Sequence, residues 1–434
     1  MTNSQKKLSR SPSARPVAIV GGIRTPFVKS FSQYSRVSNQ ELMTTSLKQL
    51  VQKYNLRGQI LGEVALGAVM KNASDFNLSR ESLLDSGLDP HTPGYDLTRA
   101  CGTSLEAAAQ IALKISAGQI ESGIAGGTDT NSDIQGVFSK KFSHLMLDLN
   151  KAKSVGQKLQ ILLKISPTDF APQFPTVAEP RTGKSMGQHC ELMVQEWQIS
   201  QREQDELALV SHKNAAKAYE DGFYKDLVFE FKGLQKDPLV RGDTSIEKLS
   251  KLKPAFDFSG KGTLTAGNST PLTDGSSAVL LTSEEYAQRK NLPILAYFID
   301  AQSAAVDFVG GEGLLMAPTI AVSEMLKRNG ITLQDFDFYE IHEAFAGQAL
   351  CTLKAWESAN YCKEKLGRSQ AMGSIDRSKL NIKGGSVALG HPFAATGTRI
   401  LASLAKMIND RGSGRGLISV CTAGGMGVAA IIEK

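Results

Sequence analysis

The chain has 434 residues, of which 41% are hydrophobic and 21% charged, so it is long enough for about two or three domains with sizeable cores. Its net charge of +6 is mild and argues against a nucleic-acid-binding protein, and no run of about 18 apolar residues could span a membrane. The five cysteines are scattered and the histidines form no H-x-x-x-H pair, which predicts a reducing compartment and no metal site.

The N-terminal segment, residues 1–15, is polar, basic and rich in serine, and the first acidic residue of the chain is Glu41. A transit peptide has this composition, but the first predicted strand, residues 17–20, begins so early that little would remain to be cleaved. The sequence therefore favours a flexible basic tail, with a targeting remnant as the alternative. We therefore expect the protein in the cytoplasm, with the mitochondrial matrix as the alternative.

Strand and helix patterns then alternate as far as residue 133. The predicted strands cover residues 17–20, 61–70, 95–97 and 122–133, and the predicted helices cover residues 39–54, 77–86 and the stretch after Cys101. This alternation predicts an α/β sheet with right-handed crossovers.

Between residues 133 and 261 the apolar runs become short, which indicates an insertion into the first α/β unit. Residues 145–165 have the pattern of one basic amphipathic helix. Four apolar residues would face inward or into a membrane surface: Leu159, Ile161, Leu162 and Ile165. Residues 133–190 hold eight Lys or Arg and four Asp or Glu, so this region either meets an anionic surface or partner or is a solvated basic face.

A strongly helical segment follows at residues 200–221, where Ser200 and Glu203 form a predicted capping box. Strand character returns at residues 261–283 and would complete the first sheet. A second α/β unit begins near residue 293. Its predicted elements are a strand at 294–305, a helix at 319–329, a strand running into a helix at 336–356, a helix at 397–412 and a closing hairpin at 416–434.

Cys101 lies at a turn between a strand end and an Ala-, Leu- and Ile-rich helix that Thr103 or Ser104 could cap. The free N–H groups and the dipole of a helix N-terminus would favour a thiolate there. Alternatively, Cys101 is one more small buried hydrophobic residue.

Three motifs of the second unit also contain reactive residues. His342 lies in EIHEAFA between a strand and a helix, His391 lies among the glycines of GGSVALGHPFAATG before a helix that begins near Thr396, and Cys421 ends a strand in CTAGGMG. Each could instead be structural, as a turn histidine or a core cysteine. Together they predict a Cys/His nucleophile system with a second acid/base.

With these motifs in order, the sequence resembles the thiolase family from Val17 to Lys434. The strings that carry the resemblance are RACGTSLEA, MGQHCE, LKPAFDFSGKGTLTAGNSTPLTDGSSA, HEAFA, GGSVALGHPFAATG and CTAGGMG. HEAFA and the long basic insertion are most similar to the thiolase β-subunits of fatty-acid β-oxidation complexes.

The resemblance implies an α/β, thiolase-like fold, in which two similar βαβαβαββ halves form a layered α/β/α/β/α core. The N-terminal half would comprise residues 16–132 plus 262–285, and the C-terminal half residues 286–434. Residues 133–261 would form an inserted loop domain that binds CoA and acyl groups and could dock a partner or a membrane.

By the same resemblance, Cys101 is the acylated nucleophile, His391 is its base and an oxyanion donor, and Cys421 is the second acid/base. His342 stands where many relatives have Asn and would keep an oxyanion role, often through water. The backbone N–H groups of Cys101 and Ala423 would form a second oxyanion hole. The residues implied in substrate or CoA binding are Arg241, Thr270, Met186 and Phe345.

The activity implied is 3-ketoacyl-CoA cleavage through an acyl-Cys intermediate, with coenzyme A as co-substrate and no bound cofactor. A homodimer is implied, together with a possible hydratase/dehydrogenase α-subunit and a possible peripheral membrane contact. Three alternatives stay open: a biosynthetic acetoacetyl-CoA thiolase, a non-catalytic acyl-CoA-binding scaffold and a decarboxylating ketoacyl synthase. The synthase would have no need of Cys421.

Overall fold

The computed structural model describes residues 14–434, so residues 1–13 of the predicted tail lie outside the described residues. Arg15 ends the predicted tail, but its backbone N–H donates to the carbonyl of Ser116 at 3.0 Å. This residue is therefore bound to the folded domain, which corrects the tail boundary. No helix in the described part of the chain is long and apolar enough to cross a membrane.

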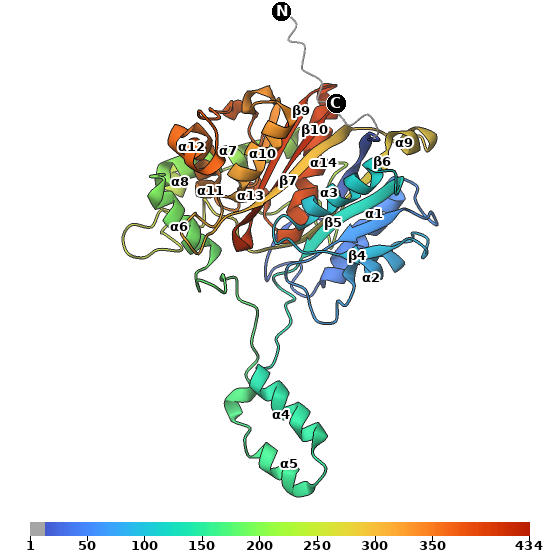
Figure 1. The fold of residues 1–434 in the computed structure, drawn as a ribbon, viewed down its shortest axis with the longest axis vertical. Coiled ribbons are helices and arrows are strands. Elements are labelled where there is room, and N and C mark those ends of the chain that lie inside the picture. Colours follow the sequence, from blue (N-terminus) through green and yellow to red (C-terminus); the bar gives the residue numbers. More distant parts are fainter. Residues whose placement is uncertain (1–13) are drawn as a thin grey trace, which may run out of the picture.

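The strands form a mixed sheet that runs through the whole molecule (Figure 1). Its order is β4-β3-β5-β6-β1-β7-β10-β9-β8, and the short β2 pairs with β6. The bounds are β1 (Val17–Arg24), β2 (Val28–Lys29), β3 (Glu63–Leu66), β4 (Gly94–Asp96), β5 (Ser122–Asp129), β6 (Thr273–Ser283), β7 (Ala296–Ala305), β8 (Phe338–Ile341), β9 (Arg415–Thr422) and β10 (Met426–Glu433).

The two halves of the sheet have the same order of strands, when the strands of each half are numbered along the chain from the first strand of that half. In the first half, β4 and β5 flank β3 in parallel, and β6 and β1 follow antiparallel. In the second half, β8 and β9 are parallel, and β10 and β7 follow antiparallel. The place of β4 is taken by a single parallel bridge between Tyr339 and Leu380. The halves join where Val17 to Ile19 of β1 pair with β7.

Helices cover the two halves of the sheet and also lie between them. The helices outside the insertion are α1 (Asn39–Lys53), α2 (Leu78–Leu84), α3 (Thr103–Ser116), α9 (Glu284–Arg289), α10 (Ala317–Asn329), α11 (Ala346–Glu357), α12 (Ala359–Leu366), α13 (Ser386–Leu389) and α14 (Thr396–Arg411). One hydrophobic core joins α3 and α14 to strands of both halves. Separate cores pack α1 and α2 on the first half, and α10, α11 and α12 on the second. These cores correspond to the predicted α/β/α/β/α layers.

The N-terminal region of α14 packs closely on α3 and β5 because two glycines leave room for backbone contact. A Cβ atom added at Gly397 of α14 would lie 2.4 Å from the backbone nitrogen of Leu105 in α3. A Cβ atom at Gly127 of β5 would lie 2.1 Å from the carbonyl oxygen of Ala394, which lies just before α14. A side chain at Gly397 would push α14 away from α3, and a side chain at Gly127 would push β5 away from the segment before α14.

Several predicted strand boundaries are wrong for local reasons. The predicted strand at 61–70 ends at Leu66, since the chain then turns so that the N–H groups of Val69 and Met70 can donate to the carboxylate of Asp129. The first strand runs on to Arg24, with a bulge between Ile19 and Gly21. The strand predicted at 122–133 ends at residue 129, and the one predicted from 261 begins only at residue 273.

The inserted region lies between β5 and β6 and consists of two parts. Its helices are α4 (Lys140–Lys151), α5 (Val155–Leu162), α6 (Met186–Glu196), α7 (Gln201–Glu220) and α8 (Ile246–Leu249). The helices α6 and α7 pack against α11 of the second half. The predicted capping box of Ser200 and Glu203 at the start of α7 is confirmed.

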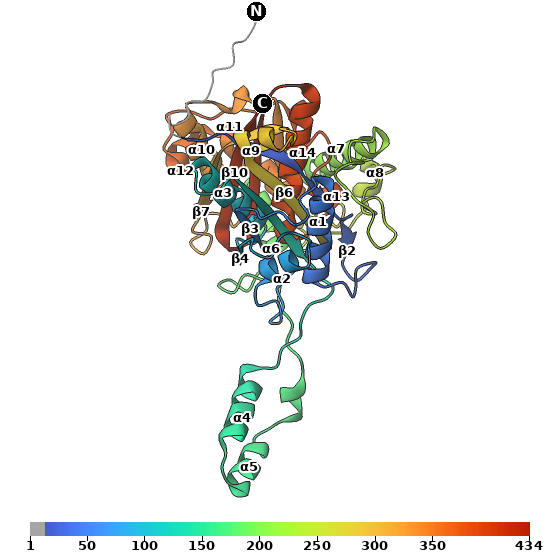
Figure 2. The same cartoon turned by 90° about the vertical axis from the view of Figure 1, so that its right-hand side faces the viewer.

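The other part of the insertion is an arm, residues 137–173, that extends away from the body (Figures 1 and 2). Its base is closed by Val137 and Gln173, whose backbone groups exchange hydrogen bonds of 2.8 and 2.7 Å. The single helix predicted at 145–165 is wrong: α4 and α5 are separate, because Ser154 and Gln157 form a capping box that starts a new helix.

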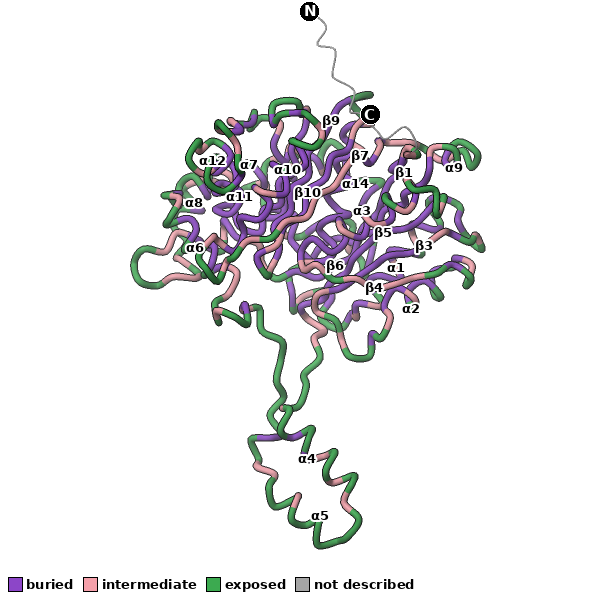
Figure 3. Tube along the Cα trace, in the orientation of Figure 1, coloured by how far each residue is buried: buried purple, intermediate pink, exposed green. Residues whose placement is uncertain are grey.

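Most of the arm is exposed, as its colouring in Figure 3 shows, and several of its exposed residues are apolar. Val155 is 83% exposed and Leu163 is 78% exposed. Leu159 and Leu162, which were predicted to face inward or into a membrane surface, are also exposed, and no core of the described body covers them. An apolar stripe flanked by lysines on a projecting element is typical of a docking surface.

A buried ion pair fastens the rest of the insertion to the first strand. Arg24 donates to both carboxylate oxygens of Asp237 at 2.6 Å, and the Phe27 backbone N–H and the Tyr219 hydroxyl also donate to this carboxylate. Both charged side chains are almost fully buried. The pair therefore holds the segment after α7 against β1.

Replacing Asp237 with Ala should destabilise the protein by about 3–5 kcal/mol, because it leaves the Arg24 charge buried without its partner. The loss would be measured as a shift of the urea unfolding midpoint. As a control, Asp243→Ala removes an exposed ion pair with Lys248 and should leave the midpoint unchanged. Equal midpoints for the two variants would contradict the anchoring role of Asp237.

Candidate active site

The candidate site lies where the N-terminal ends of α3 and α14 meet. Cys101 precedes α3 in the first half, and His391 precedes α14 in the second half. In chain order, each residue lies between the third and the fourth strand of its half, if the Tyr339–Leu380 bridge is counted as the third strand of the second half. The pseudo-symmetry of the halves therefore pairs Cys101 with His391.

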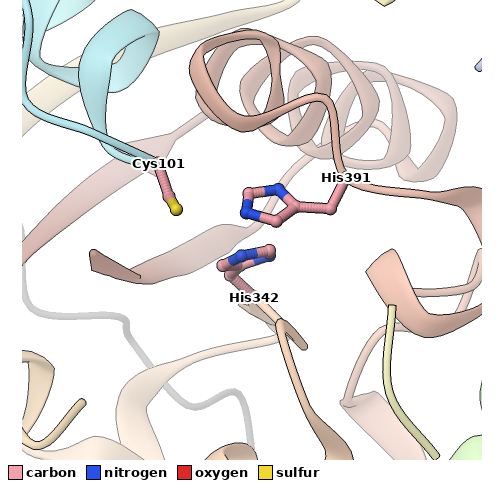
Figure 4. A group of neighbouring side chains, drawn as sticks. All are labelled: Cys101, His342 and His391. Carbon is pink, nitrogen blue, oxygen red and sulfur yellow. The ribbon is translucent and has the colours of Figure 1, made fainter. Parts of the chain in front are cut away.

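His342 completes the group from the turn that follows β8. The thiol sulfur of Cys101 and ring nitrogens of His342 and His391 lie within 4.8 Å of one another. In Figure 4 the sulfur points toward the two rings, whose centroids are 4.1 Å apart. The three residues are 8%, 1% and 4% exposed, respectively. Three donor atoms of this kind could also bind a soft divalent metal, so the absence of a metal site stays a prediction.

Cys101 is held at the helix end by a local backbone arrangement. Ala100 has φ of 43°, a left-handed conformation, and Gly102 caps the helix without a side-chain bond. The predicted cap by Thr103 or Ser104 is wrong. The Thr103 hydroxyl instead binds the backbone of Arg99 and Ala100.

Burial raises the pKa of the Cys101 thiol to about 12, although N–H groups of Ala423 and of Cys101 itself act in the opposite direction. The expectation of a thiolate at rest is therefore wrong, because desolvation outweighs the helix N-terminus. A thiol with such a pKa reacts as a nucleophile only after a base has taken its proton. The same N–H contact places Ala423 beside the sulfur, where the sequence had placed an oxyanion hole.

His391 is held in place by the hydroxyl groups of two threonines. Its Nδ1 atom lies 2.6 Å from Oγ1 of Thr396, and its backbone N–H donates to Oγ1 of Thr273. Its Nε2 atom has no hydrogen-bond partner among the described residues. Burial and the charge of Arg399 lower the pKa of His391 to about 3, so the ring is neutral before it receives a proton.

His342 is fixed in a similar way by a different hydroxyl. Its Nδ1 atom lies 2.8 Å from Oγ of Ser386, and its backbone N–H donates to the carbonyl of Ser419. Its Nε2 atom also lacks a partner within the described chain. Burial, His391 and Arg399 together hold the pKa of His342 well below its usual value.

Cys421 lies close enough to Cys101 for the two thiols to interact electrostatically. It belongs to β9 and is buried, and the backbone N–H of Ala344 donates to its sulfur. Burial and the electrostatic interaction with Cys101 raise the pKa of Cys421 well above its usual value. The structure thus brings both predicted thiols and both predicted histidines to one site.

Two of the residues predicted to bind substrate or CoA lie beside Cys421. Phe345 packs edge-on against Phe256 and shares a hydrophobic core with Cys421, and Met186 borders the same core. An apolar wall next to the second thiol suits a pantetheine or acyl chain.

The other two predicted binding residues have different surroundings. The Thr270 hydroxyl donates to the carbonyl of Ala344 at 2.9 Å, so it supports the turn that carries His342. Arg241 is exposed, two residues after Leu239, whose side chain approaches Gly390. The backbone N–H of Arg241 donates to Nδ1 of His212.

Sequence reasoning missed the groups that hold the reactive residues. Thr396 and Ser386 stand behind the histidines, and both occur in the GGSVALGHPFAATG string, where a hydroxyl close to a reactive histidine is the available signal. Glu179 accepts from the N–H of Gly424 at 2.7 Å and thereby fixes the turn after Cys421. No local pattern indicates that contact, because it joins the insertion to the last hairpin.

Comparison with known protein families gives the class of this protein. Residues 17–285 match the family described as "Thiolase, N-terminal domain", and residues 292–434 match "Thiolase, C-terminal domain". The chain belongs to the thiolase family, as its motifs suggested.

Particular relatives narrow the comparison. A 3-ketoacyl-CoA thiolase of Shewanella baltica (strain OS155) is 41% identical over 425 residues, which cover 96% of each chain. A protein of the same name from Shewanella sp. (strain ANA-3) is 40% identical over the same share. The crystal structure of the Bacillus anthracis acetyl-CoA acetyltransferase is similar with a TM-score of 0.80 and 30% identity, covering 98% of this chain and 100% of that one.

Proposed function

We propose that this thiolase cleaves 3-ketoacyl-CoA with coenzyme A to acetyl-CoA and an acyl-CoA two carbons shorter. The observation that carries the proposal is the convergence of one thiol and two buried, unpartnered Nε2 atoms at one point. Such a group can make a nucleophile and then stabilise the oxyanion that its attack creates.

In the first half-reaction, Nε2 of His391 takes the proton of Cys101, and the thiolate attacks the C3 carbonyl. The oxyanion accepts hydrogen bonds from His391 and from His342, directly or through a water. Cleavage of the C2–C3 bond leaves an acyl-Cys101 thioester and the enolate of acetyl-CoA. The N–H groups of Cys101 and Ala423 hold the thioester oxygen of that enolate.

Cys421 acts as the acid that completes the first half-reaction and as the base in the second. It protonates C2 of the enolate, which leaves as acetyl-CoA, and it then takes the proton of the incoming CoA thiol. The CoA thiolate attacks acyl-Cys101 and releases the shortened acyl-CoA, while Cys101 leaves as a thiolate and recovers its proton from His391. A second thiol is needed because the first carries the acyl group at this stage.

The degradative role is favoured over the biosynthetic acetoacetyl-CoA role by the exposed arm and by HEAFA, which carries His342 in place of the usual Asn. Thiolysis should be measured with 3-ketoacyl-CoA substrates from acetoacetyl to long chain. A rate that rises with chain length supports a β-oxidation enzyme. Activity confined to acetoacetyl-CoA would favour the biosynthetic alternative, and no cleavage by folded protein would favour the scaffold alternative.

We also infer that the protein is a homodimer and that Arg241, Thr270, Met186 and Phe345 contact the CoA substrate.

All five cysteines are unpaired. This supports a reducing compartment, either the cytoplasm or the mitochondrial matrix.

The arm of residues 137–173 is the proposed contact for a hydratase/dehydrogenase α-subunit, with a membrane surface as the alternative. Replacing residues 138–172 with two glycines is feasible because Val137 and Gln173 are already paired at the base. This deletion should abolish co-purification with an α-subunit and leave short-chain thiolysis unchanged, since the arm lies away from the site. Sedimentation with anionic vesicles separates the two alternatives, and unchanged association after deletion would contradict both.

A further inference from the structure

The inner ring nitrogens of the two histidines have different surroundings. His391 Nδ1 faces the hydroxyl of Thr396, whereas His342 Nδ1 faces the hydroxyl of Ser386. The two hydroxyl groups differ in their other contacts. Oγ of Ser386 also accepts a hydrogen bond from Nη2 of Arg399 at 2.7 Å. The Arg399 side chain is 2% exposed, and Ser386 is fully buried. A guanidinium, a hydroxyl and an imidazole therefore form one buried chain.

Arg399 fixes the direction of this chain. A guanidinium has only donors, so the oxygen of Ser386 is the acceptor in their bond. The serine hydroxyl carries one hydrogen, and Nδ1 of His342 is its only hydrogen-bond acceptor among the described residues. Because buried hydroxyl groups are rarely left unpaired, Ser386 donates to Nδ1. The neutral ring of His342 then carries its proton on Nε2, the atom that faces Cys101.

We propose that Ser386, oriented by Arg399, is a positioning residue that fixes His342 as an Nε2–H donor toward the reacting carbonyl oxygen. The identity of that oxygen rests on the proposed function, but the position of the ring proton does not. The two histidines thereby have separate roles. His342 donates a hydrogen bond throughout, and His391 receives the proton of Cys101.

The charges around Arg399 support this division of roles. A protonated His342 would have to point Nδ1–H at Ser386, whose hydroxyl already faces a cation, and Arg399 helps to hold the pKa of His342 low. Burial lowers the pKa of Arg399, and the carboxyl groups of Glu340 and Glu343 act in the opposite direction. Among the described residues no cation donates to the Thr396 hydroxyl, so this hydroxyl can accept Nδ1–H of His391 and leave Nε2 free to take the proton of Cys101.

The test uses the full-length enzyme with ¹⁵N-labelled histidine and the variant Ser386→Ala. Nitrogen chemical shifts report which ring nitrogen of His342 carries the proton, and His342→Asn assigns its signal. Ser386→Cys keeps a weak donor in nearly the same volume. Ser211→Ala is the matched control, because the Ser211 hydroxyl is equally buried and binds Gly385 N–H and Glu343, but not His342. The rate of Cys101 acylation by 3-ketoacyl-CoA is measured on each protein.

In the wild type, the proton of His342 is expected on Nε2 between about pH 6 and 8, where a ring with a strongly lowered pKa stays neutral. Ser386→Ala should populate both tautomers and slow acylation about tenfold to a hundredfold, somewhat less than outright loss of an oxyanion donor. KM for CoA should not change, and Ser386→Cys should recover part of the rate.

Three results would overturn the assignment: a wild-type proton on Nδ1, a Ser386→Ala variant with wild-type tautomer and rate, or an equal loss in Ser211→Ala. A wild type that shows the expected tautomer but cleaves no 3-ketoacyl-CoA would overturn the proposed function and leave the tautomer assignment standing.

Discussion

Cys101→Ala is expected to abolish both cleavage of 3-ketoacyl-CoA and acylation of the protein. The sulfur lies within 4.8 Å of a ring nitrogen of each histidine, and alanine offers no atom that could carry the acyl group. The loss should bring the rate to background, because the covalent route then no longer exists. Steady-state thiolysis together with the intact mass of the protein measures both effects.

The control for this variant is Cys351→Ala, which removes another buried, unpaired thiol. Cys351 lies within α11, so its loss should leave acylation and turnover in place. Turnover near the wild-type rate in Cys101→Ala would refute the assignment of the nucleophile. A similar loss in both variants would mean that buried thiols act here through stability alone.

Cys421→Ser should give an enzyme that still acylates but turns over slowly. Once Cys101 carries the acyl group, the incoming CoA thiol needs another base, and a serine hydroxyl is a far weaker acid/base than a thiol. General acid–base catalysis contributes about 10²–10⁴-fold, so a loss of that size in kcat is expected. Rapid-quench measurements should show an acyl-enzyme that accumulates and decays slowly when CoA is added.

Cys190→Ala is the matched control, since Cys190 is buried in the same hydrophobic core as Cys421. It should retain most of the turnover, because no step uses its thiol. If Cys421→Ser shows no defect, or if the control shows the same defect, the acid/base role of Cys421 is wrong.

The order of strands and helices could be predicted because each apolar run and capping signal is local. The Ser200–Glu203 box and the closing hairpin are clear in the sequence for that reason. The break between α4 and α5 could also have been found from Ser154 and Gln157, but the continuous apolar pattern outweighed that signal.

The site was predictable in its residue types and less so in its electrostatics. Each reactive residue stands in a recognisable string, yet the pKa of Cys101 depends on how completely distant segments bury it. The contacts of Ser386 with Arg399, and of Glu179 with Gly424, join residues whose proximity only the fold creates. The pairing of Cys101 with His391 across the two halves likewise required the strand order.

The central claim is that Cys101 is acylated by a 3-ketoacyl-CoA and discharged by CoA. The most direct measurement is the intact mass of the protein after mixing with 3-ketoacyl-CoA in the absence of CoA, followed by peptide mapping. The account predicts one added acyl group, two carbons shorter than the ketoacyl chain, on Cys101, which disappears when CoA is added. An unmodified protein that nevertheless cleaves the substrate, or an acyl group on another residue, would contradict it.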